Sequence, residues 1–204
     1  MKQSFFIRHP RIKDFFSLVF FVVVVFFGTL FINTYIFRSF SVSGHSMDNT
    51  LANGDRLFIN RLPLTIASIS NKPYQPERGE IIVFKNPNFT ENSENEFIIK
   101  RVIAFGGERV TINDGVLLVY NEEHPDGYEY DQEYRKDGVG PLSPVGGDGL
   151  DVIVPEGNIF VSGDNRIGLS NSYDSRTGLG TIPLFDIIGP VSFRYMPFTS
   201  IRSF

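Results

Sequence analysis

Phe97-Ile98-Ile99-Lys100-Arg101-Val102-Ile103 is an apolar run with two adjacent basic residues at its centre. Val, Ile and Phe favour the pleated, half-buried surface of a sheet, so the run is predicted to be a β-strand. Alternate residues of a strand share a face, which places Lys100 between Ile98 and Val102 and turns Arg101 to the other face. The sequence therefore predicts a lysine held among apolar side chains.

Similar short apolar runs recur through residues 39–204, separated by turn residues. Asn113-Asp114-Gly115 lies between two of them and is typical of a tight β-hairpin. Because no segment here keeps a 3.6-residue period, we expect a mainly β fold with a coiled, partly barrel-like sheet and one short helix near Pro63–Ser70. The other predicted strands are Arg56–Asn60, Glu80–Phe84, Arg109–Ile112, Val116–Tyr120, Val152–Val154, Ile159–Ser162 and Ile187–Tyr195, and the central run extends to Ala104.

Residues 121–150 differ from the rest because they are polar, acidic and rich in Gly and Pro. A structureless stretch of this length is unusual inside a core. We expect a solvated excursion or long hairpin within an inserted β subdomain that covers about 107–155.

The N-terminal part of the chain contains an uncharged run, Phe15–Phe37, of mostly Phe, Val, Ile and Leu. As a helix it would be about 35 Å long, enough to cross a hydrocarbon core of about 30 Å. A cleaved signal peptide is the main rival, but its apolar core is shorter and ends at a small-x-small site, which this run lacks. We expect a basic N-terminus over 1–14, a transmembrane helix over 15–37 and an extracytoplasmic β-rich domain over 38–204.

Charge around this helix predicts its orientation. Lys2, Arg8, Arg11 and Lys13 precede it, and only Arg38 follows it closely. The positive-inside rule puts the N-terminus in the cytoplasm and everything after the helix outside. A bacterial cytoplasmic (inner or plasma) membrane fits better than an organelle membrane, because no transit peptide precedes the helix.

Composition excludes several function classes. There is no Cys, so a disulfide framework, a thiolate nucleophile and Cys-ligated zinc are excluded. The net charge is −4, which does not favour a nucleic-acid partner. We expect neither a metal site nor a cofactor.

Lys100 and a serine could together supply nucleophilic chemistry. Burial lowers a lysine pKa, and a neutral lysine is a competent general base near neutral pH. A serine hydroxyl needs such a base, and Gly44 lets the backbone turn sharply just before Ser46. Histidine is the alternative base. His9 is predicted to be cytoplasmic, His124 lies in the acidic excursion, and His45 adjoins Ser46 in the chain. A Ser-His-Asp triad therefore remains an alternative, although the sequence offers few histidines for it.

The C-terminal third of the chain contains a polar segment that could also contribute to a catalytic site. Gly163-Asp164-Asn165-Arg166 is followed by Ser172-Tyr173-Asp174-Ser175-Arg176. Arginine forks paired with carboxylates can build a charge network here, and a hydroxyl could orient a neutral lysine amine.

Together these segments resemble bacterial signal peptidase I, the leader peptidase family of Ser-Lys proteases. The resemblance covers the whole chain except 121–150, and the N-terminal helix agrees with it. The matching boxes, in order, are Ser46-Met47 with Thr50-Leu51, Gly54–Leu57, Arg78–Phe84, Lys100–Ile103, and Gly163–Arg166 with Ser172–Arg176.

The resemblance implies a function and roles for individual residues. Ser46 would be the nucleophile, its backbone N–H part of the oxyanion site, and Lys100 the general base. Met47 would line the substrate pocket. Ser172 would orient the lysine, with Ser170 as the fallback, and Asp164, Arg166, Asp174 and Arg176 would brace the site. The implied reaction removes signal peptides from secretory preproteins at the bilayer surface, after small residues at positions −1 and −3.

Four departures from the family pattern accompany the resemblance. The gap between Arg166 and Ser172 is about three residues longer than the family pattern, which is why Ser170 is the fallback. Asn49 and Gly106 stand where the family usually has Pro, and Gly44 stands where some members carry a serine that donates to the oxyanion. Two alternatives to the lead hypothesis remain: a Ser-Lys protease dedicated to one secretion system, and a catalytically inactive, membrane-tethered β-rich binding protein.

Overall fold

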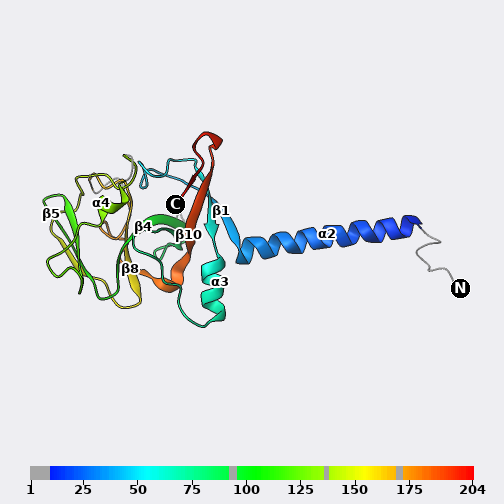
Figure 1. Cartoon of the computed structure of the whole chain (residues 1–204), viewed down its shortest axis with the longest axis horizontal. Helices are drawn as coiled ribbons and strands as arrows, with labels where there is room; N and C mark the ends of the chain where they lie inside the picture. The colour runs from blue at the N-terminus through cyan, green and yellow to red at the C-terminus, as the bar shows by residue number, and fades with distance from the viewer. Residues whose placement is uncertain (1–9, 92–95, 136–137, 169–171) are drawn as a thin grey trace.

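The computed structural model describes residues 10–91, 96–135, 138–168 and 172–204. Outside these ranges lie Lys2 and Arg8, which contributed to the predicted orientation of the helix. His9, one alternative base, and Ser170, the fallback for orienting the lysine, also lie outside them. A long helix, α2 (Pro10–Tyr35), projects alone from a β-rich body (Figure 1). The mainly β fold class predicted from the sequence is confirmed.

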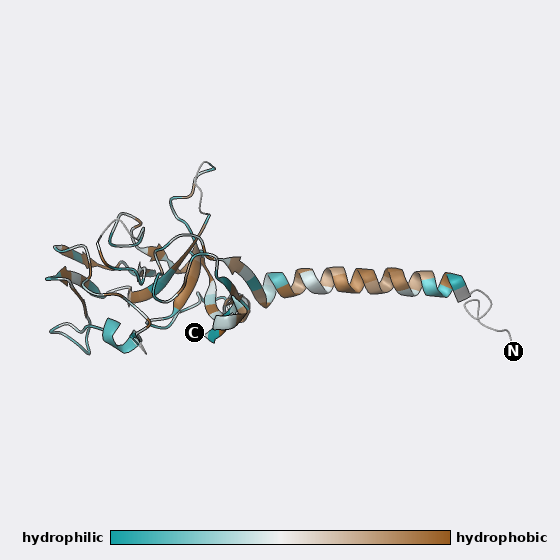
Figure 2. Ribbon diagram, turned by 90° about the horizontal axis from the view of Figure 1, so that it is seen from above, coloured by the Kyte–Doolittle hydropathy of each residue, from teal (hydrophilic) through white to brown (hydrophobic). Residues whose placement is uncertain are grey.

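Helix α2 is apolar and exposed along its length, and Figure 2 shows its hydrophobic middle between more polar ends. By length and composition, residues Arg11–Tyr35 are suited to cross a membrane. The helix ends two residues before the predicted boundary, because Phe37 begins strand β1 (Phe37–Ser41) and pairs with Asn60.

The main sheet curls into a half-barrel and runs in the order β1-β2-β10-β3-β4-β8-β9, with β11 on the edge of β10. Strand β10 causes the curl, because its first half pairs with β3, its second half pairs with β2, and bulges interrupt both ladders. The remaining strands of this sheet are β2 (Arg56–Asn60), β3 (Ile81–Lys85), β4 (Phe97–Phe105), β8 (Asn158–Ser162), β9 (Ile182–Pro183), β10 (Ile187–Met196) and β11 (Arg202–Ser203).

A separate three-stranded sheet, in the order β6-β5-β7, lies within the stretch predicted as an insertion. The predicted hairpin joins β5 (Arg109–Asn113) to β6 (Val116–Tyr120) through Asp114 and Gly115, both at positive φ as a tight turn requires. Strand β7 (Leu150–Ile153) completes the sheet.

Short helices fill the connections. Helix α3 (Leu62–Ile69) lies where one short helix was predicted, and its early Pro63 suits the first turn. Helix α4 (Asp131–Tyr134) was not predicted from the polar sequence around it. Two 3-10 turns, η1 (Leu184–Asp186) and η2 (Phe198–Ser200), flank β10.

Buried apolar side chains form three clusters that fix strand β4 in place. One contains Ile98 and Val102 of β4, and a second joins the small sheet to Ile103 of the same strand. The third contains Met47 and Leu51, which seat the loop after β1 on the half-barrel. Alternate residues of β4 therefore face different clusters, as the sequence pattern predicted.

Candidate active site

Ser46 lies in a turn that follows β1 and is anchored by its apolar neighbours. Met47 and Leu51 are almost fully buried, whereas Ser46 itself is only half-buried. Gly44 adopts a φ of +93°, which favours glycine, and its N–H donates to Asn53 Oδ1 (3.0 Å). The turn therefore presents the Ser46 hydroxyl while its flanks are held by the core.

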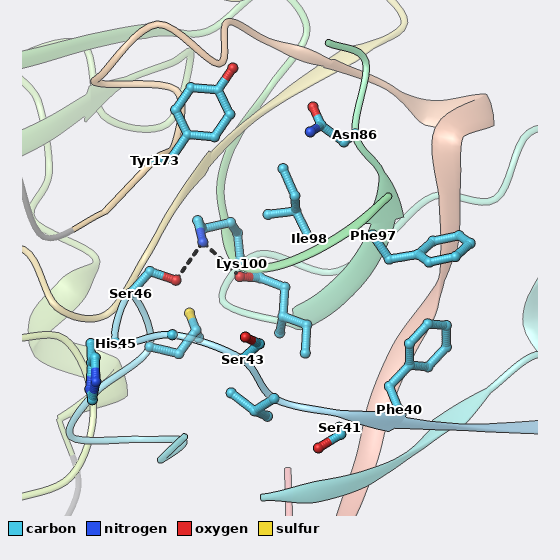
Figure 3. A pocket seen from close by; sticks show the side chains of 14 residues that line it. Phe40, Ser41, Ser43, His45, Ser46, Asn86, Phe97, Ile98, Lys100 and Tyr173 are labelled. Carbon is cyan, nitrogen blue, oxygen red and sulfur yellow. Dashed lines mark hydrogen bonds between the residues drawn. The ribbon is translucent and has the colours of Figure 1, made fainter. Parts of the chain in front are cut away.

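Lys100 lies in the middle of β4 with its amine against this turn. Lys100 Nζ is 2.6 Å from Ser46 Oγ and donates to the Ile99 carbonyl at 3.0 Å (Figure 3). The side chain is 3% exposed, and its neighbours on the same face, Ile98 and Val102, are apolar. Hence the structure brings together the two residues that the sequence singled out.

Burial lowers the pKa of Lys100 from 10.5 to about 8. The carboxylates of Asp174 and Asp164 oppose this shift, and the positive charge of Arg176 adds to it. Burial dominates because the hydration free energy that the ammonium form loses exceeds the attraction of the two carboxylates. The amine is thus shifted towards the pH range in which a base must work.

A cleft of about 390 Å³ opens beside the pair. Its walls come from two strands, β1 and β4, and three loops. Figure 3 shows Tyr173 and Asn86 above the pair and Phe40 and Phe97 to its right. Met47, which the resemblance places in the substrate pocket, contributes to the lining of this cleft. Apolar side chains and extended backbone form much of the walls. The lining residues are Phe40–Met47, Asn86, Phe97–Lys100 and Tyr173.

Asp164 and Arg101 lock the strand of Lys100 to the loop of Ser46. Arg101, on the other face of β4, donates to Asp164 through Nε (2.8 Å) and Nη2 (2.5 Å). The Thr50 hydroxyl donates to the same carboxylate at 2.5 Å. Both charges are buried, and a buried ion pair needs such extra hydrogen bonds to offset its desolvation.

Asp174 is the centre of a second buried network. It accepts hydrogen bonds from the Ser172 hydroxyl (2.6 Å), the Gly163 N–H (2.9 Å) and the Arg176 guanidinium (2.8 Å from Nη2). Burial raises the pKa of Asp174, but Arg176 and the other donors outweigh burial and lower that pKa below its ordinary value. The aspartate therefore remains ionised and holds Ser172 beside the site.

Arg166 connects the site to the excursion, which is not simply solvated as predicted. Its fully buried guanidinium forms an ion pair with Asp131 of α4, and the Arg166 carbonyl accepts from Gly146 N–H (2.7 Å) and Arg176 Nη1 (3.0 Å). Since a buried arginine needs a counter-charge, the acidic excursion supplies one and folds back to do so.

Gly163 is required where the last polar segment passes the nucleophile. A Cβ at this position would lie 2.2 Å from the Ser46 carbonyl oxygen and 2.3 Å from Ser172 Oγ. The neighbouring Asn165 N–H donates to the same carbonyl at 3.0 Å. The absent side chain thus lets Ser46 and Ser172 approach each other across the Gly163 backbone.

Known proteins of one family match most of the chain. A model of the family described as "Signal peptidase, peptidase S26" matches residues 12–196. The chain belongs to this signal peptidase family. "Signal peptidase I" of Bacillus licheniformis is 30% identical over 89% of the chain and 88% of its own length. "Signal peptidase I T" of Bacillus subtilis (strain 168) is 33% identical over 89% of the chain and 85% of its own length.

One solved structure that resembles the chain is the crystal structure of a signal peptidase I from Enterococcus faecalis V583. The superposition covers 57% of the present chain and 96% of the Enterococcus chain, with 26% sequence identity and a TM-score of 0.39. Membership of the signal peptidase family, together with the relatives, makes the chain a serine peptidase and so a hydrolase. The bacterial signal peptidase resemblance drawn from the sequence is confirmed.

Histidines are poorly placed in this signal peptidase. His45 is 71% exposed, and its Nδ1 lies 3.1 Å from Asp48 Oδ2 rather than against the nucleophile. Figure 3 shows its ring pointing away from the Ser46–Lys100 pair. His124 stacks on Tyr128 in the excursion. Within the described ranges, no group of three or more His, Asp or Glu could hold a metal ion.

Asn49 shows how this signal peptidase accommodates a departure from the family pattern. Its φ of +80° is out of reach of proline, whose ring fixes φ near −65°. Its Nδ2 donates to the Gly140 carbonyl in the excursion at 2.7 Å. Asparagine is among the few residues that tolerate positive φ, so here it fits the turn better than the usual proline.

Several residues around the site were missed by sequence reasoning. Thr50, Arg101 and Gly163 lie inside the matching boxes, and alternation along β4 could have singled out Arg101. Asp131 gave no local signal, because one acidic residue in an acidic stretch is not distinctive. The fallback Ser170 lies outside the described residues.

Proposed function

We propose that this enzyme removes signal peptides from secretory preproteins, with Ser46 as nucleophile and Lys100 as general base. One observation carries the proposal: a buried amine with a lowered pKa lies 2.6 Å from a serine hydroxyl at the edge of a peptide-sized cleft. The curated relatives named signal peptidase I support the substrate class.

The proposed reaction begins with Lys100 neutral. Its Nζ–H donates to the Ile99 carbonyl, which leaves the nitrogen lone pair for the Ser46 proton. Ser46 Oγ then attacks the scissile carbonyl carbon, and the resulting ammonium of Lys100 protonates the leaving amine. In the second half, Lys100 takes a proton from water, the hydroxide attacks the acyl carbon, and Lys100 returns the proton to Ser46 Oγ as the acyl group leaves as a carboxylic acid.

Backbone geometry supports an oxyanion site at the nucleophile. Among the described residues, the Ser46 N–H has no hydrogen-bond acceptor, so it is available to a developing oxyanion. Because Gly44 has no side chain, the hole has to rely on backbone donors of this kind.

Asp164, Arg166, Asp174 and Arg176 would act by holding these groups in place, and Ser172 by orienting the amine. The Ser172 hydroxyl donates its proton to Asp174, so its oxygen lone pairs remain as an acceptor for the Lys100 amine. The amine itself contacts Ser46 and Ile99, so orientation by Ser172 would require a further contact.

We further propose cleavage after small residues at −1 and −3, because side chains at alternate positions of an extended peptide face the same apolar wall. Helix α2 would cross a bacterial cytoplasmic membrane with the N-terminus inside and residues 38–204 outside. This places the cleft near the bilayer from which a signal peptide emerges. The β5–β7 sheet would belong to the subdomain inserted over about 107–155.

The test is cleavage of a purified preprotein by the full chain in detergent, followed by mapping of the cut. Ser46→Ala and Lys100→Ala should each abolish cleavage, whereas Ser68→Ala, at an exposed serine of α3 outside the cleft, should retain activity. Wild-type rates in either dyad variant would defeat the proposed mechanism. Loss with His45→Ala but not with Lys100→Ala would indicate a triad.

Two other functions would give different results in the same assay. A catalytically inactive, tethered binding protein would bind preprotein without cutting it. A Ser-Lys protease dedicated to one secretion system would cut only the substrates of that system. Cleavage of several unrelated preproteins with small −1 and −3 residues would exclude both.

A further inference from the structure

Two arginines lie side by side where helix α2 meets the β-rich body. Arg38 of β1 and Arg61, just before α3, line one hollow together with Asn33, Thr34 and Ser39. The Arg38 guanidinium carbon lies 4.9 Å from the ring centroids of both Phe40 and Phe97. A stacked guanidinium keeps its N–H edges available for a planar or tetrahedral anion.

Neither arginine has an acidic partner among the described residues. Among the described residues, the other buried and half-buried arginines pair with carboxylates except Arg202, which lies over the Phe204 ring, and the body is acidic enough to supply a partner. Arg61 Nε is buried without a hydrogen-bond partner in the described part of the chain. The paired arginines are Arg78, Arg101, Arg109, Arg135, Arg166, Arg176 and Arg194.

Placing two positive charges together is unfavourable unless something compensates them. Burial, and then the positive charge of Arg38, lower the pKa of Arg61 below its ordinary value. A bound anion would relieve the repulsion and satisfy the orphaned Nε–H of Arg61 at once. The hollow therefore has the electrostatics of an unfilled anion site.

The carboxyl end of α2 opposes an anion only weakly. A helix end carries about half a negative charge, against two full positive charges here. Two carbonyls at this end already have donors, because Tyr35 O accepts from Thr65 Oγ1 (2.9 Å) and Ile36 O accepts from the Arg61 N–H (2.8 Å). The two guanidinium groups are thus not needed to cap Tyr35 and Ile36.

The position of the hollow indicates where its anion comes from. Asn33 and Thr34 end the long apolar run of α2, which is the level at which a membrane helix leaves the hydrocarbon. Helix α3 is tied to this point by Thr65, has no buried residue, and exposes the apolar side chains of Ile66 and Ile69. Figure 1 shows α3 beside the end of α2 that meets the body, so these side chains would rest on the same bilayer surface.

We propose that Arg38 and Arg61 form a binding site for the phosphate of an anionic phospholipid in the outer leaflet. The phosphodiester would accept from both guanidinium groups, with Asn33 and Thr34 as additional donors. Such a lipid would fix the depth and tilt of the β-rich body at the membrane surface. The inference depends on α2 spanning the bilayer but not on the identity of the catalytic residues.

The test measures the affinity of the full chain, in a neutral detergent, for short-chain phosphatidylglycerol. We expect Arg61→Gln to weaken binding at least fivefold, and R38Q/R61Q at least tenfold. The matched control R56Q/R202Q removes the same charge from arginines outside the hollow and should change the affinity less than twofold. Circular dichroism and thermal melting establish that each variant is folded.

Three results would overturn the proposal. One is equal affinity in the wild type, the R61Q variant and the double variant. Another is an equal loss in the control, which would show attraction to overall charge rather than a site. The third concerns the source of the anion: inorganic phosphate binding as tightly as the lipid, and displacing it competitively, would make a free anion the ligand.

Discussion

Acidification should inactivate this peptidase by protonating a single buried amine. With a pKa of about 8, Lys100 is neutral in about a tenth of the molecules at pH 7. Each further unit of acid removes about nine-tenths of the remaining neutral amine. The value of kcat/KM should therefore fall about 100-fold between pH 7 and pH 5, because only neutral Lys100 can take the Ser46 proton.

The assay is cleavage of a quenched fluorescent peptide with Ala at −1 and −3, at concentrations well below KM. The full chain is kept in one detergent, and buffers of constant ionic strength cover pH 5 to 9. The acid limb should have unit slope and a midpoint near pH 8. Melting curves at each pH separate loss of activity from loss of fold.

A profile that stays flat from pH 8 to pH 5 would refute the reasoning, because no ammonium can act as the base. An acid limb with its midpoint near pH 6.5 that disappears in His45→Ala would also refute the reasoning, because the general base would then be an imidazole and not the Lys100 amine. Either outcome would also mean that burial at β4 does not serve catalysis.

Three substitutions test the surrounding architecture. Folding lowers the pKa of Lys100 from 10.5 to about 8, so its burial costs about 3 kcal/mol below pH 8, and this cost shrinks as the pH rises towards 10.5. Lys100→Met should accordingly raise the melting temperature more at pH 6 than at pH 9.5, and a gain independent of pH would contradict the titration. Gly163→Ala should lower kcat at least 100-fold, because a Cβ there would lie 2.2 Å from the Ser46 carbonyl oxygen. The control is Gly28→Ala, whose added Cβ would meet no atom within 4 Å. Similar kinetics for the two variants would exclude the steric argument. Asn49→Pro should cost about 1–3 kcal/mol of stability because its φ is +80°, whereas Asn49→Gly keeps that backbone; equal melting temperatures for the two would show that the turn is not constrained.

Local patterns were enough to predict most of the strands. Arg56–Asn60 and Val116–Tyr120 were predicted with their observed bounds, and α3 within one residue at each end. The alternation along Phe97–Ile103 also predicted which side of β4 holds the lysine. These predictions succeed because strand periodicity and turn chemistry depend on neighbours in the chain.

Contacts between distant segments account for what was missed. Phe37 was assigned to the membrane helix, but pairing with Asn60 draws it into β1. The acidic stretch was expected to be solvated, but the buried guanidinium of Arg166 recruits Asp131 from it. Neither preference is visible locally, because the partner lies at least 20 residues away in the chain.

The order of residues by itself determined that one apolar helix precedes a β domain, and that a lysine would sit among apolar neighbours on its strand. Only the tertiary structure decided that this lysine meets Ser46, and that Thr50, Arg101 and Asp164 lock their two segments together. The reason is that strand alternation is set by covalent geometry, whereas the distance between two loops depends on how a whole sheet curls. That curl also lowers the pKa of the amine, since burial exists only after the chain has closed around it.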